Sequence, residues 1–75
     1  MFQVLQDNKP CASYNVKGWK QDTFENLKDA QLFMLNWAYP YTMEQVEANY
    51  IPFKVNKEYD LSMGEFPVRM KIIQI

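Results

Sequence analysis

The stretch DTFENLKDAQLFMLNWAYP, residues 22–40, decides the fold of this 75-residue chain. At about 100° per residue, most apolar side chains of residues 23–38 cluster on one stripe, which predicts an amphipathic α-helix. We expect Asp22 to be its N-cap, because Glu25 follows at the spacing of a capping box. Pro40 disfavours helical geometry in the residue before it, so the helix is expected to end there.

Strand periodicity flanks this helix on both sides. Before it, residues 2–16 carry apolar side chains on even positions around the turn-rich tetrapeptide 7–10, which predicts a β-hairpin. After it, residues 53–63 and 68–75 alternate in the same way around a turn at 64–67. The two ends of the chain are therefore expected to form two hairpins of one antiparallel sheet.

A second, shorter helix is expected over residues 43–50. Thr42 and Gln45 form a capping-box pair in front of it, and Pro52 ends it. The element order is then ββααββ, in a single α+β domain that covers residues 1–75. Such a domain has a four-stranded antiparallel sheet with one long and one short helix packed on one face.

The second half of the long helix has more apolar side chains than one stripe can hold. Leu32 and Phe33 point away from the core stripe, on opposite flanks. One interpretation is that the second helix and the corner at residues 39–41 cover Leu32 or Phe33. The other is that one of them, with Trp37 or Tyr41, forms an exposed patch for a partner, since interface cores are rich in aromatic side chains.

The last strand poses the same question. Ile73 and Ile75 lie on the face opposite Val68, Met70 and Ile72, so the strand is apolar on both faces towards its end. A central position in the sheet, or an end covered by a loop, would explain this pattern. An exposed face or edge that pairs with another chain would explain it too.

Composition argues against catalysis and against metal binding. The chain has no histidine and one cysteine, Cys11, so it lacks the residues of a nucleophile–histidine pair or of a zinc site. We expect Cys11 to be a small buried apolar side chain. The carboxylate pairs Glu44 with Glu47 and Glu58 with Asp60 are expected on solvent-exposed faces. The sequence therefore predicts a protein that is not an enzyme and needs no cofactor.

Targeting features are missing from the sequence as well. The N-terminal residues lack the basic region and the long apolar run of a signal peptide. The longest apolar run, residues 32–35, is too short to span a bilayer. Together with the unpaired cysteine, these observations predict a cytoplasmic protein without membrane contact.

One loop suggests an alternative function. Lys17, Trp19 and Lys20 combine cations with an aromatic ring, which is how single-stranded nucleic acid is held, and Arg69 and Lys71 could extend the surface. A tryptophan folded over the helix start between solvated lysines would give the same sequence. The formal charge of −1 argues against a general nucleic-acid binder.

The opening FQVLQDNKPCASY, residues 2–14, followed by a helix that contains DAQ at 29–31, is similar to small accessory proteins of bacteriophages. Those typically open with a hairpin, continue with an amphipathic helix and finish on an apolar strand. The resemblance covers about the first 38 residues and the final strand, and no diagnostic motif carries it. Residues 16–21 and the second helix depart from the pattern. The resemblance implies an effector that binds and inhibits a host protein in the host cytoplasm, in bacterial defence or transcription.

The sequence thus favours a non-enzymatic protein-binding module. Its contacts are predicted to come from an aromatic set: Trp19, Phe33, Trp37, Tyr39 and Tyr41. A single-stranded nucleic-acid binder and a subunit that assembles with copies of itself are the alternatives. A protein of this size can gain stability from such association, because its own core is small.

Overall fold

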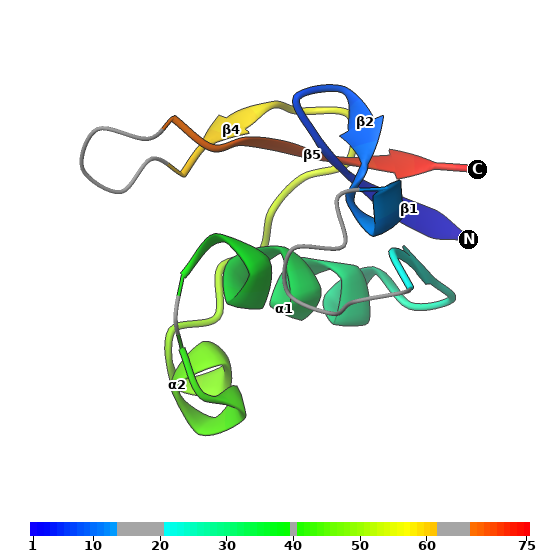
Figure 1. Cartoon of the computed structure of the whole chain (residues 1–75). Coiled ribbons are helices and arrows are strands. Elements are labelled where there is room, and N and C mark those ends of the chain that lie inside the picture. Colours follow the sequence, from blue (N-terminus) through cyan, green and yellow to red (C-terminus); the bar gives the residue numbers. More distant parts are fainter. Residues whose placement is uncertain (14–20, 40, 62–66) are drawn as a thin grey trace.

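The computed structural model describes residues 1–13, 21–39, 41–61 and 67–75, and in this part of the chain two helices lie on one side of an antiparallel sheet (Figure 1). The described strands are β1 (Phe2–Gln6), β2 (Lys9–Pro10), β3 (Thr23–Phe24), β4 (Tyr59–Asp60) and β5 (Arg69–Gln74). The helices are α1 (Leu27–Ala38) and α2 (Met43–Ala48), with a 3-10 turn η1 at Cys11–Ser13. The predicted α+β class, with one long and one short helix, is confirmed.

The sheet has the strand order β2-β1-β5-β4. β3 lies on the same edge of β1 as β2: β2 pairs with Leu5 and Gln6, and β3 pairs with Phe2 and Gln3. β5 therefore lies between β1 and β4, and Val55 adds a parallel bridge to Ile72. This central position applies to residues 69–72 of β5, whereas the pairings of Ile73 and Gln74 are with β1. At its end, however, the Ile75 side chain is 59% exposed beside the first residue, Met1.

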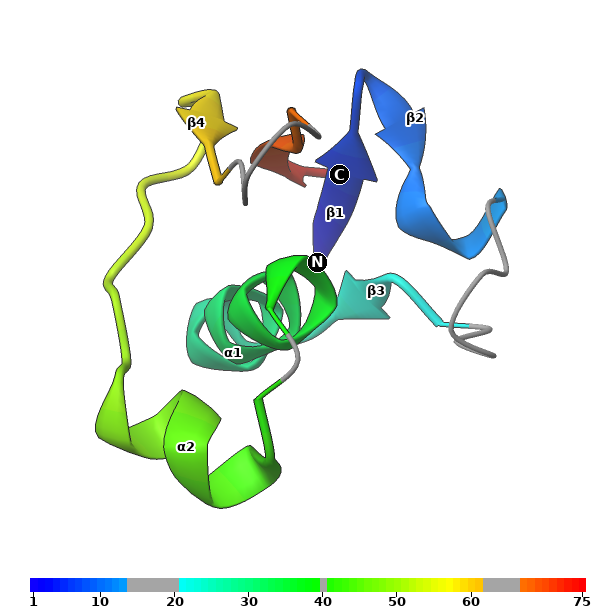
Figure 2. The same cartoon turned by 60° about the vertical axis from the view of Figure 1, so that its left-hand side comes forward.

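α1 covers the sheet, and α2 packs against the side of α1 that faces away from it (Figure 2). The core lies mainly between α1 and the two long strands, where the side chains of Met34 and Trp37 are buried with Val4, Met70 and Ile72. The predicted placement of both helices on one side of the sheet holds. The short helix is, however, separated from the sheet by the long one.

α1 begins later than predicted. Its N-cap is Asn26, and Thr23–Phe24 pair as strand β3 with β1. Asp22 is buried, where its side chain accepts the Ala12 N–H at 3.0 Å and its carbonyl accepts the Val4 N–H at 2.9 Å. The predicted capping box at Asp22 is wrong, because these bonds hold that residue at the sheet edge.

The first hairpin forms, with its turn at Asp7 and Asn8, whose φ angles are 51° and 64°. Two consecutive residues with positive φ are typical of a tight hairpin turn, and Asp and Asn tolerate this conformation. The returning strand was predicted to continue to residue 16. It ends at Pro10, where the turn η1 begins, and residues 14–16 lie outside the described part of the chain.

The predicted capping box of the short helix is confirmed. The Thr42 side chain accepts the Gln45 N–H at 3.2 Å, and the Gln45 side chain accepts the Thr42 N–H at 2.9 Å. Within the described residues 53–61 the predicted strand at 53–63 is shorter, because Asn56 turns the chain with a φ of 62° and Tyr59–Asp60 form the ladder with β5. Residues 62–66, which include most of the predicted turn, lie outside the described part of the chain.

Candidate functional site

Two of the predicted contact residues are buried in the structure. Phe33 is 5% exposed and Trp37 is 4% exposed. The Phe33 ring packs against Phe24 and Trp37, with centroid distances of 5.1 Å and 5.7 Å. Phe33 and Trp37 are therefore buried, and these two ring contacts of Phe33 come from β3 and from α1 itself rather than from the second helix or the corner at residues 39–41.

The other aromatic candidates lie beyond the C-terminal end of α1. Tyr39 and Tyr41 are half-buried, their rings are 5.3 Å apart, and both pack against the core. The side-chain amide of Asn36 donates to the Tyr41 carbonyl at 3.0 Å, which ties this corner to the helix. Trp19 lies outside the described residues.

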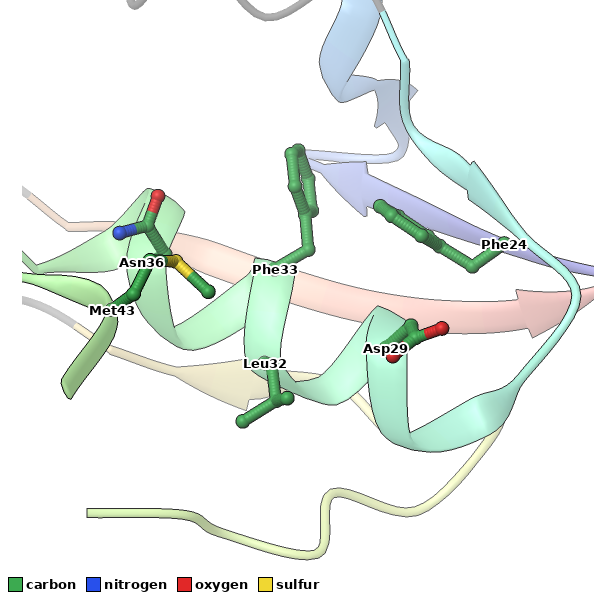
Figure 3. Close-up of a pocket in the computed structure, with 6 residues that line it drawn as sticks. All are labelled: Phe24, Asp29, Leu32, Phe33, Asn36 and Met43. Atoms are coloured by element: carbon green, nitrogen blue, oxygen red, sulfur yellow. The ribbon is translucent and has the colours of Figure 1, made fainter. Parts of the chain in front are cut away.

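An open pocket is present instead on the exposed flank of α1, with a volume of about 250 Å³ (Figure 3). It is lined by residues of β3, α1 and the start of α2: Phe24, Asp29, Leu32, Phe33, Asn36 and Met43. Leu32, the other side chain that the sequence placed off the core stripe, is half-buried here. Met43 is 57% exposed, so much of the pocket wall is apolar surface in contact with water.

A second hollow of about 490 Å³ lies on the neighbouring side of the same flank, between α1 and the end of α2. It is lined by Lys28, Asp29, Leu32, Glu47 and Tyr50. Asp29 and Leu32 line both hollows, so the two are adjacent. We call the combined surface, formed by the residues of both hollows, the interhelical groove.

Helical spacing explains why these side chains line one groove. Asp29, Leu32 and Asn36 are separated by three and four residues, so they form one exposed stripe of α1. On α2, Met43 and Glu47 are four residues apart on the side that faces α1, where Val46 is buried. Val46 holds the two helices together, and the stripes beside it stay open to solvent.

A buried hydrogen-bond pair fixes the far rim of the groove. The Gln31 side chain donates to the Phe53 carbonyl at 2.7 Å and accepts a hydrogen bond from the Tyr50 hydroxyl. The Lys28 ammonium lies 5.5 Å from the centroid of the Tyr50 ring, within cation–π range. Tyr50 is thus held at the groove by a side chain of the core.

The charges around the groove are mainly negative. Asp29 and Glu47 line it, and Glu44 stands one turn before Glu47 on the same flank of α2. All three carboxylates are exposed, and Lys28 is the basic residue among the groove residues. The groove therefore combines apolar walls with an acidic rim.

The residues that the sequence singled out for catalytic chemistry are the thiol of Cys11 and the paired carboxylates. Cys11 is buried, and burial, with the nearby Asp22 carboxylate, raises the pKa of its thiol to about 12. Glu44 and Glu47 are exposed, as predicted for that pair. In the described ranges, no three His, Cys, Asp or Glu side chains form a group that could hold a metal ion. No described helix has the length and apolar character that crossing a membrane requires.

The residues of the nucleic-acid alternative are only partly described. Arg69 is exposed and Lys71 is half-buried, and they alternate along β5 with the buried Met70 and Ile72. They therefore lie on the face of the sheet opposite α1. Lys17, Trp19 and Lys20 lie outside the described residues.

Comparison with protein-family models, with curated proteins and with solved structures gives no match. The groove must therefore be interpreted from its own geometry and chemistry. The resemblance to bacteriophage accessory proteins stays a prediction from the sequence.

The sequence predicted one part of the groove. Leu32 was expected to lie off the core stripe of the long helix, and it is half-buried and lines both hollows. The prediction did not include Phe24, Asp29, Met43 or Tyr50. A sequence signal for the groove was Met43, which directly follows the N-cap Thr42. An apolar side chain at the start of a short helix indicates a contact with a neighbouring element or a partner.

Proposed function

We propose that this chain is a non-enzymatic protein-binding module whose contact surface is the interhelical groove. The observation that supports this most directly is the open apolar wall formed by Leu32 and the exposed Met43. Hollows of this kind take the anchor side chains on which binding between proteins mainly depends.

The open form of the groove supports a protein partner over a small molecule. Sites for small ligands usually bury most of the ligand surface. Both hollows are open rather than enclosed, so a small ligand would keep much of its surface in water. A pocket of this kind suits one or two apolar side chains that project from a larger partner.

The sheet offers less to a partner than the helices do. β2, β3 and β4, which carry the outer edges of the described sheet, are two residues long. Short edge strands are a feature that prevents strand addition. A partner is therefore expected at the helical side of the molecule.

On the resemblance stated above, the partner is a host protein, and binding would inhibit it in bacterial defence or transcription. This role rests on the first 38 residues and the last strand, whereas the groove includes α2, which the resemblance does not cover. The binding proposal therefore stands without it.

Affinity capture with paired variants tests the proposal. Leu32→Glu places a charge in the groove, and Ile75→Glu places the same charge on an exposed apolar side chain that does not line the groove. We expect a captured protein to be lost by about tenfold or more with Leu32→Glu and retained with Ile75→Glu. Thermal unfolding of both variants shows whether they are folded. Equal capture by both would contradict the proposal.

A further inference from the structure

The walls of the interhelical groove are helices, and their dimensions fit a helical partner. The exposed stripe of α1 from Asp29 to Asn36 covers eight residues, and the seven steps between them rise by about 10 Å at 1.5 Å per residue. This is about two turns of a partner helix. Met43 and Tyr50 stand on the opposite wall, so a third helix laid between the walls would cover both of these exposed side chains.

The rim charges decide which kind of helix fits. Two exposed carboxylates, Asp29 and Glu47, and one ammonium, Lys28, are among the lining residues. Glu44 adds an exposed carboxylate outside the lining, one turn before Glu47 on α2. The Lys28 ammonium lies 5.5 Å from the centroid of the Tyr50 ring, which holds the positive charge at the Tyr50 end of the groove. A partner with basic side chains on its flanks would be attracted, and one with acidic flanks would be repelled.

We infer that the groove binds an amphipathic helix of a partner protein, with apolar anchors at i, i+3 or i+4 and i+7 and with lysine or arginine on its flanks. This inference rests on the proposed function and names the chemistry of the partner. Such a helix inserts its apolar side chains beside Leu32 and Met43 and places its cations next to Asp29 and Glu47. Helix-in-groove recognition uses this spacing of anchors.

A second copy of the chain fits the groove less well. α2 carries two glutamates and no lysine or arginine, so its charge matches that of the rim. α1 carries one lysine and one aspartate and presents most of its apolar side chains to its own sheet. Neither described helix has the basic flank that the groove requires.

A displayed library of random helical peptides tests the inference. The wild-type protein and a Glu44→Lys/Glu47→Lys variant are used as separate targets. We expect the wild type to enrich peptides with apolar residues at helical spacing and a net positive charge, and the variant to enrich neutral or acidic ones. For a selected basic peptide, fluorescence anisotropy should show at least about fivefold weaker binding to the charge-reversed variant and in high salt.

Leu32→Glu is the third target and separates the two proposals. If selected peptides lose binding to Leu32→Glu but show no preference for positive charge, the groove is a docking site and the inference about its partner is wrong. If the selected peptides bind Leu32→Glu as well as the wild type, both proposals are wrong. A library that yields no binder, or a dimer in sedimentation that Leu32→Glu dissociates, also overturns the inference.

Discussion

The indole N–H of Trp37 donates a hydrogen bond of 2.6 Å to the side-chain oxygen of Gln6 and so joins α1 to β1. The pair belongs to the contact between α1 and the opening strand of the chain, β1. Trp37 is a residue of the core in this arrangement, although its chemistry is that of many interface residues.

Trp37→Phe tests this assignment. The substitution keeps an apolar ring and removes the hydrogen bond to Gln6, so we expect the free energy of unfolding to fall by about 1–2 kcal/mol. Partner capture by the folded fraction should not change. Urea denaturation and capture measured on the same sample check both statements. Wild-type stability with lost capture would place Trp37 in the interface.

The pH dependence of stability should report the burial of Cys11. Its pKa is raised from 9.0 to about 12 in the folded protein, because burial and the nearby Asp22 disfavour the thiolate. Between these values the unfolded chain releases the thiol proton and the folded chain keeps it. The stabilisation is therefore fully present below pH 9 and is lost as the pH rises through that window.

The matched control for this prediction is Cys11→Ala. Its own stability will be lower because of the vacated volume, but its stability should fall less steeply between pH 9 and pH 12 than that of the wild type. Urea unfolding at several alkaline pH values gives both slopes. Other titrating groups are common to the two proteins and cancel in the comparison. Parallel slopes would contradict the assignment.

Local patterns in the sequence predicted those elements that are determined locally. The capping-box pair Thr42 and Gln45 is complete within four residues, and it forms as predicted. β5 was recognised because alternation marks the buried Met70 and Ile72. Both signals come from residues close together in the sequence, so these elements can be predicted from one sequence alone.

Elements that depend on distant partners were misplaced. The spacing of Asp22 and Glu25 fits a capping box, but Thr23 and Phe24 gain pairing with β1, which only the folded chain provides. The groove was out of reach for the same reason, since it exists only because α2 packs beside the flank of α1 that carries Leu32. Periodicity gives the faces of a helix but not the partner of each face.

Gln31 is expected to stabilise the wall of the groove. Gln31→Leu removes the amide that donates to the Phe53 carbonyl and accepts from Tyr50, so a buried carbonyl loses this donor. The expected loss is about 1–3 kcal/mol in the free energy of unfolding. The control Gln74→Leu changes an exposed glutamine on β5 and should cost less than about 0.5 kcal/mol. Chemical denaturation of the two variants decides between a supporting and a neutral role.

The nucleic-acid alternative predicts binding of single-stranded oligonucleotides, which the proposed groove interaction does not. If Arg69 and Lys71 hold phosphates on the outer face of the sheet, single-stranded oligonucleotides should bind at low salt and dissociate as salt is added. With the groove as the contact surface, we expect no such binding. Fluorescence anisotropy with a labelled oligonucleotide measures it. Salt-sensitive binding that the Arg69→Gln/Lys71→Gln variant weakens would favour the alternative.

A substitution at the exposed end of the sheet distinguishes self-assembly from binding to another protein. Ile75 is 59% exposed, and Met1, which bonds to it through the backbone, is exposed beside it. If these side chains formed an interface between copies, the mass measured by light scattering would rise with concentration and Ile75→Glu would abolish the rise. We expect a constant mass instead, because two isolated apolar side chains cover far less than the roughly 1,200 Å² that a stable interface usually buries. A dimer that is insensitive to Ile75→Glu but lost with Leu32→Glu would place a second copy in the groove.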